Sequence, residues 1–152
     1  MLRKIRALGI SLQSYFLLLI RVYWGYQFLI TGFGKLTNLD QIAAYFQSLG
    51  IPFPSLNALC AGSTEMIGGT LLVLGLFSRL ASIPLLGVMA VAYLTAERDS
   101  LVTLFTQFDP DPFFSRTPFL FTYALLLVFC FGPGRISLDY WFSGAYKNRE
   151  MP

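Results

Sequence analysis

The chain has 152 residues, of which 55% are hydrophobic and only 12% are charged, with a formal net charge of +3. A soluble domain usually carries about 25% charged residues, so this composition favours a membrane protein, and the small, scattered net charge does not indicate nucleic-acid binding. The sequence contains no histidine, which excludes His-ligated haem, His-ligated zinc or copper, and Ser-His-Asp catalysis.

Four apolar segments predict one all-α membrane domain over residues 1–152, folded as a four-helix bundle. A bilayer crossing needs about 20 apolar residues. The basic N-terminal end resembles the start of a signal peptide, but the apolar run behind it is too long and contains Arg21. We therefore predict that this run is a retained first span. The four predicted spans are residues 12–36, 56–77, 79–96 and 115–133.

The segments between and after these spans are more polar. Ile42, Tyr45, Phe46 and Leu49 recur at helical spacing before a Gly-Ile-Pro-Phe-Pro turn, which predicts a short helix lying in the membrane interface. Residues 97–117 are expected to form a polar connection. The tail over 135–152 is rich in aromatic residues and predicts a second interfacial segment rather than a fifth span.

Basic residues flank the predicted spans unevenly, and cytoplasmic flanks usually carry more of them. The membrane side that holds both chain termini has seven basic residues (Arg3, Lys4, Arg6, Arg79, Arg135, Lys147 and Arg149). The opposite membrane side has three (Lys35, Arg98 and Arg116). This difference predicts that both termini are cytoplasmic and that Arg79 anchors the topology. The expected location is the inner cell membrane, with several crossings.

Arg21 and Glu65 lie deep within the first and second predicted spans. A charge at such a depth costs about 2.5–3.5 kcal/mol on insertion scales unless it is paired or hydrated. Counted from the cytoplasmic ends, the two residues come to similar depths, which predicts an ion pair. Three interpretations stay open: a structural link between two helices, the wall of a pocket for a polar group such as a quinone ring, or an ion or proton path.

The first span carries five residues spaced 4, 3, 4 and 3 apart, which places them on one helical face. They are Arg21, Gly25, Phe28, Gly32 and Lys35. The glycines allow another backbone to approach closely. Lys35 either extends to lipid phosphates or faces the mouth of a pocket. The candidate quinone-binding residues are Arg21, Lys35, Glu65 and Phe28.

Cys60 and Cys130 are the two cysteines, and they do not form a C-x-x-C motif. The predicted spans place them roughly 15 Å or more apart along the membrane normal. A disulfide requires Cα atoms within about 7 Å. We predict two free thiols, no metal site and no intrinsic redox centre, with a quinone as the candidate cofactor.

Four motifs occur in order over about residues 20–140, and together they resemble the DoxX family. They comprise Arg21, Gly25, Phe28, Gly32 and Lys35; Gly50, Ile51, Pro52 and Pro54; Glu65, Gly68, Gly69, Leu74, Gly75, Leu76 and Arg79; and Gly132, Pro133, Gly134, Arg135, Ser137, Leu138 and Asp139. The resemblance implies a four-helix membrane bundle whose polar signature is Arg21, Lys35, Glu65 and Arg79. It also implies a link to membrane-associated oxidoreductase complexes, because the family takes its name from the small membrane subunit of a thiosulfate:quinone oxidoreductase.

The leading functional hypothesis is an integral membrane subunit of an oxidoreductase complex, acting as an anchor with a quinone-head-group site. No catalytic motif supports an enzyme that works alone. The alternatives are a non-catalytic assembly subunit of a larger membrane complex and, with less support, a small transporter. The expected partners are the lipid bilayer and other membrane or membrane-associated subunits, and not nucleic acid.

Overall fold

A computed structural model describes the backbone of residues 2–147 and the side chains of residues 12–142, and all regular secondary structure in that part is helical. This confirms the all-α prediction. In chain order the helices are α1 (Leu2–Thr37), α2 (Leu39–Ser48), α3 (Pro54–Leu74), α4 (Ser78–Thr95), α5 (Arg98–Thr106), α6 (Asp111–Phe114), α7 (Thr117–Phe131) and α8 (Leu138–Lys147).

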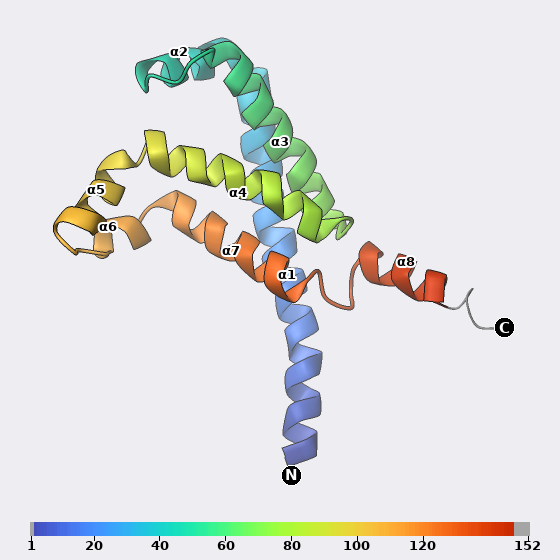
Figure 1. The fold of residues 1–152 in the computed structure, drawn as a ribbon. Coiled ribbons are helices and arrows are strands. Elements are labelled where there is room, and N and C mark those ends of the chain that lie inside the picture. Colours follow the sequence, from blue (N-terminus) through green and yellow to red (C-terminus); the bar gives the residue numbers. More distant parts are fainter. Residues whose placement is uncertain (1, 148–152) are drawn as a thin grey trace.

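The four longer helices pack as two pairs. Figure 1 shows α1 beside α3 and α4 beside α7, with the second pair running obliquely to the first. The N-terminal part of α1 extends beyond the other helices, and α2 lies over the start of α3. The pairs meet in an apolar core to which α1, α3, α4 and α7 all contribute. Its buried members are Phe28, Leu72, Leu85, Met89, Leu125 and Val128.

Glycines set the distance between α1 and α3. A Cβ atom added to Gly69 would meet the carbonyl oxygen of Gly25 at 2.6 Å, and one added to Gly32 would meet the carbonyl oxygen of Gly62 at 2.7 Å. Both contacts are too short for a real side chain, so only glycine fits there. The predicted face of α1 is confirmed, because Arg21, Gly25, Phe28 and Gly32 are buried and Lys35 is half-buried.

Several predicted boundaries need correction. Helix α1 contains the predicted span over 12–36 and begins earlier, at Leu2. The helix expected over 56–77 runs from Pro54 to Leu74, where Gly75 adopts φ of +70° and closes the last turn. The expected polar connection over 97–117 contains the two helices α5 and α6. The short helix predicted before the Gly-Ile-Pro-Phe-Pro turn is confirmed as α2.

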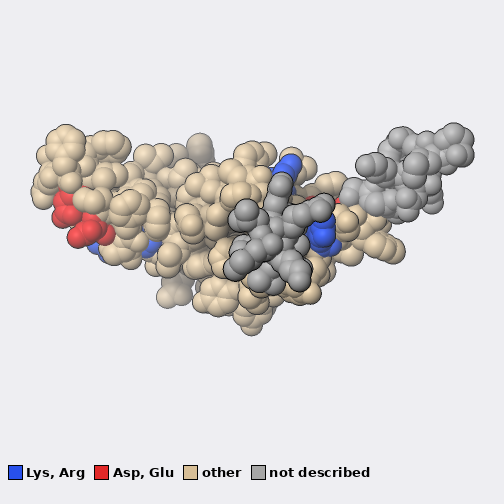
Figure 2. Space-filling view, turned by 90° about the horizontal axis from the view of Figure 1, so that it is seen from below, with Lys and Arg blue, Asp and Glu red and all other residues tan. Residues whose placement is uncertain are grey.

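The surface of these helices is strongly apolar. Among the described residues, Leu12–Thr37 and Ser78–Thr95 are the helical segments long and apolar enough to cross a membrane, while α7 is apolar but shorter. Only 28% and 33% of their apolar windows are buried, so most of these side chains face outwards, as lipid contact requires. Viewed from the end where α1 protrudes, the molecule is mostly uncharged, with acidic side chains gathered at one edge (Figure 2).

Candidate functional site

A cavity of about 400 Å³ lies between α2, α3 and α4. Ligand sites in proteins commonly measure about 300–1,000 Å³ and combine apolar walls with a few polar groups. Here α2 contributes Tyr45 and Phe46, and α4 contributes Val88 and Val91. The polar groups come from α1 and α3, which carry Lys35 and Glu65 into the same wall.

Lys35 and Glu65 form an ion pair, with 2.5 Å between the Lys35 Nζ and the Glu65 Oε1. The Glu65 side chain is 1% exposed and that of Lys35 is 25% exposed. The second carboxylate oxygen, Oε2, is buried and has no hydrogen-bond partner among the described residues. The Lys35 ammonium has three N–H donors and uses one on Glu65, so each partner keeps hydrogen-bonding capacity that the protein does not fill.

The direction of side chains on a helix explains why this pair forms. A helical side chain points towards the N-terminus of its own helix. Since Gly25 faces Gly69 and Gly32 faces Gly62, α1 and α3 are antiparallel, and Glu65 faces α1 below the level of Lys35. Lys35 therefore points down α1 towards Glu65, while Glu65 points up towards Lys35.

The predicted Arg21–Glu65 ion pair is wrong. The register of α1 and α3 places Glu65 opposite α1 about eight residues, or roughly 12 Å, beyond Arg21. The two side chains also point away from each other, because each is directed towards the N-terminus of its own helix. Arg21 instead donates hydrogen bonds from Nη1 to the Pro133 carbonyl oxygen at 2.7 Å and from Nη2 to the Ile136 carbonyl oxygen at 2.8 Å.

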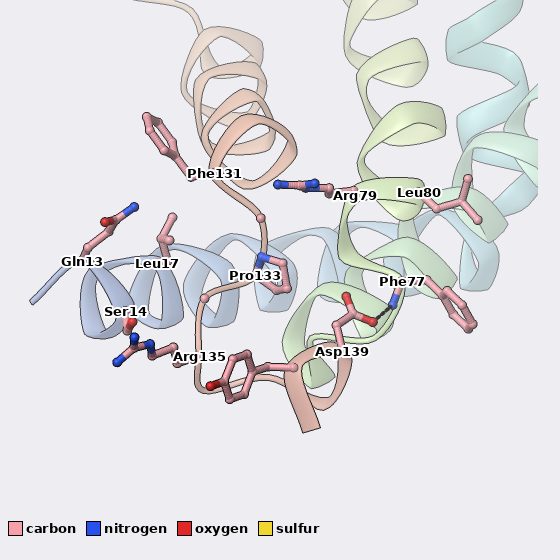
Figure 3. Close-up of a pocket in the computed structure, with 13 residues that line it drawn as sticks. Gln13, Ser14, Leu17, Phe77, Arg79, Leu80, Phe131, Pro133, Arg135 and Asp139 are labelled. Carbon is pink, nitrogen blue, oxygen red and sulfur yellow. Dashed lines mark hydrogen bonds between the residues drawn. The ribbon is translucent and has the colours of Figure 1, made fainter. Parts of the chain in front are cut away.

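Arg21 belongs to a second polar cluster, at the opposite end of α3, and it does not line the cavity beside Glu65. Gly75 packs against its guanidinium so closely that an added Cβ would lie 2.5 Å from Nη1. Asp139 ties the same cluster to α4, because its carboxylate accepts hydrogen bonds from the backbone N–H groups of Phe77 and Ser78 (Figure 3). This cluster fastens the α3–α4 turn and the α7–α8 connection to α1, which is a structural task.

Phe28, predicted as a candidate quinone-binding residue, does not line this cavity. Its side chain is fully buried in the core, and its ring packs edge-on against Phe121 of α7 with 4.7 Å between the ring centroids. Phe28 shares a face of α1 with Lys35. At Phe28 that face packs against α3 and α7, and it reaches the cavity only at Lys35, near the C-terminal end of α1.

Arg79 lies at the start of α4 and donates a long hydrogen bond of 3.4 Å to the Cys130 carbonyl oxygen. Cys60 lines the cavity, Cys130 lies near the end of α7, and both are free and exposed. The described residues contain no group of three or more His, Cys, Asp or Glu side chains that could hold a metal ion. The basic residues Arg3, Lys4, Arg6, Lys147 and Arg149, which entered the predicted orientation, have side chains outside the described part.

Sequence reasoning missed the contribution of α4 to the cavity. Pro84 and Gly87 both line it. Pro84 has no N–H to offer the preceding turn, and a Cβ added to Gly87 would meet no atom within 4 Å. A proline and a glycine in one apolar helix indicate a face that is irregular or not closely packed. The sequence did not indicate which neighbouring helix that face would lie against.

The arrangement suits a ligand that is largely apolar and carries hydrogen-bond acceptors. Lys35 offers donors from the wall, and the unpartnered Glu65 oxygen can accept a hydrogen bond.

Comparison with known proteins gives a consistent picture. The profile of the DoxX family matches residues 16–98. The "Uncharacterized membrane protein Rv3486" of Mycobacterium tuberculosis is 33% identical over 125 residues, covering 79% of this chain and 77% of the relative. The "Inner membrane protein YphA" of Escherichia coli K12 is 40% identical over 63 residues, covering 41% of this chain and 45% of the relative. No solved structure matches the chain significantly.

Proposed function

The chain belongs to the DoxX family of membrane proteins, and from this premise we propose that it is a membrane subunit of an oxidoreductase complex that binds a quinone head group between α2, α3 and α4. One observation carries the proposal. A buried carboxylate with an unpartnered oxygen stands beside a lysine in the wall of a largely apolar cavity. The remaining Lys35 N–H groups can donate to a quinone carbonyl oxygen, and the hydroxyl of the reduced quinol can donate to Glu65 Oε2, which would otherwise stay unpaired at a cost in free energy.

In this proposal the chain is a single domain in the inner membrane, and α1, α3, α4 and α7 cross the bilayer. Helix α7 is short, so residues flanking it are needed to span the full thickness of the bilayer. Both termini lie in the cytoplasm, since the end with Arg79 and Arg135 carries the larger number of basic residues. The α5–α6 region and the cavity then lie towards the outer side of the membrane.

Two residues have distinct tasks at the site. Lys35 donates a hydrogen bond to a quinone carbonyl oxygen, and Glu65 orients Lys35 through their ion pair. The quinone supplies two-electron chemistry that also takes up two protons. In this proposal, the electrons come from a partner subunit.

The cavity can be filled without disturbing the helices around it. Gly87 lines the cavity, whereas Gly34 on α1 does not, and an added Cβ meets nothing within 4 Å at either position. Gly87→Leu should therefore abolish binding of a short-chain ubiquinone, measured by equilibrium dialysis of the detergent-solubilised protein. Gly34→Leu is the matched control and should bind as the wild type does. Normal binding by the Gly87 variant would refute the site.

The alternative is a non-catalytic assembly subunit, favoured by the fact that the Lys35–Glu65 pair also links α1 to α3. Under that alternative, Glu65→Ala lowers the amount of protein in the membrane without changing any rate per assembled complex. A Glu65→Ala protein at normal abundance with reduced quinone-dependent turnover favours the redox subunit.

A further inference from the structure

A second pocket of about 640 Å³ lies at the other end of the helices, away from the Lys35–Glu65 pair. It is lined by Gln13, Ser14 and Leu17 of α1, by the start of α4, and by the loop from α7 to α8, with Arg79 and Arg135 among its residues (Figure 3). Neither the oxidoreductase hypothesis nor the structural cluster around Arg21 uses these two arginines. We propose that this pocket binds the phosphate group of an anionic phospholipid.

The positive charge of the pocket favours the binding of an anion. Arg79 makes one hydrogen bond, at 3.4 Å, and Arg135 makes none within the described part of the chain. The carboxylate of Asp139 also lines the pocket, but both of its oxygens accept backbone N–H groups, and Arg21 interacts with it electrostatically. The charges left uncompensated are therefore the two guanidinium groups, whose planar donors match phosphate oxygens.

The position of the pocket supports a lipid as the source of that phosphate. Helix α4 (Ser78–Thr95), which is long and apolar enough to cross a membrane, begins beside this pocket. The arginines consequently lie at the boundary where lipid head groups reside. The neighbouring walls include Phe77, Leu80 and Phe131, which are 61%, 65% and 58% exposed and provide an apolar surface for acyl chains.

The test compares phosphatidylglycerol with phosphatidylcholine of identical acyl chains, added in equal amounts to the full chain in mild detergent. Bound lipids are counted by native mass spectrometry. The wild type should retain phosphatidylglycerol in preference. Arg79→Gln should weaken that preference about fivefold and the Arg79→Gln/Arg135→Gln double variant roughly 30-fold, from the typical contribution of a basic residue near a membrane surface.

Arg98→Gln is the matched control, because it removes an exposed arginine from the opposite end of the helices. It should leave the preference unchanged. Arg79→Lys keeps the charge and should retain most of the preference, so a loss caused by misfolding of the glutamine variant is recognised. Equal retention of the two lipids by the wild type, or an unchanged preference in the double variant, would overturn the proposal. Binding of inorganic phosphate alone at least as tightly as phosphatidylglycerol would overturn the lipid as the source.

Discussion

Lys35→Met should be one of the most damaging single substitutions at the cavity. Methionine keeps much of the apolar chain of lysine but removes the ammonium group. The Glu65 carboxylate, at 1% exposure, then loses the partner of Oε1 while Oε2 already has none. Removing one partner of a buried ion pair costs about 3–5 kcal/mol, which lowers the folding equilibrium constant by roughly two to four orders of magnitude.

Replacing the other partner of the pair, Glu65, should lower the free energy of unfolding by less. Glu65→Gln leaves a neutral amide in the buried position and a lysine whose side chain is 25% exposed, so it can turn towards water. We expect a loss of about 1.5–3 kcal/mol, the usual contribution of a hydrogen bond to a charged group. In Lys35→Met/Glu65→Met no buried charge remains, so this double variant should be more stable than Lys35→Met alone.

The assay is reversible unfolding by dodecyl sulfate in mixed micelles, followed by tryptophan fluorescence. Trp24 on α1 packs against Phe121 of α7 with 4.7 Å between the ring centroids, so its emission reports the contact between the two helix pairs. Glu97→Gln, at the exposed ion pair with Arg116, is the control and should cost less than about 1 kcal/mol. If Lys35→Met costs no more than that control, Glu65 is not a buried charge held by Lys35, and the reasoning fails.

Three further predictions use the same unfolding measurement. Arg21→Gln should lower the free energy of unfolding by about 3 kcal/mol, because it removes two charge-assisted hydrogen bonds, while quinone affinity per folded molecule stays unchanged; a selective loss of affinity would contradict this. Gly32→Ala should be strongly destabilising because its Cβ would meet the Gly62 carbonyl oxygen at 2.7 Å, whereas Gly34→Ala, with open space around it, should be neutral or stabilising by up to about 1 kcal/mol. Asp139→Ala should cost about 1–2 kcal/mol through loss of the cap on α4, and Asp139→Asn less; equal losses would argue against capping.

The helices themselves could be predicted because composition and periodicity act locally. The 4-3-4-3 spacing on the first span identified the face that packs, and the glycines on it indicated a close helix contact. The helices α5 and α6 were missed because Asp109, Pro110, Asp111 and Pro112 resemble a turn. In the structure, α5 has already ended at Thr106, and these residues lead into α6, with Pro112 near its start, where the missing N–H is tolerated.

The polar partners could not be predicted from depth alone. Counting from predicted span ends placed Arg21 and Glu65 at one level, but α3 ends at Leu74 and α1 begins near Leu2, so both reference points were shifted. Pairing the glycines first would have given the register, since Gly25 with Gly69 and Gly32 with Gly62 describe a single antiparallel alignment. Side-chain direction would then have selected Lys35 for Glu65.

The cavity depends on an angle between helices, which no local pattern encodes. It exists because α4 runs obliquely to α3 while α2 lies over the start of α3 (Figure 1). The cluster around Arg21 fixes the other end of this arrangement, where the α3–α4 turn is bound to α1 and to the α7–α8 connection. Arg21 can therefore influence the cavity only through the angle it helps to hold. A turnover defect in an Arg21 variant should disappear when activity is expressed per folded complex, whereas a defect in a Lys35 or Glu65 variant should persist.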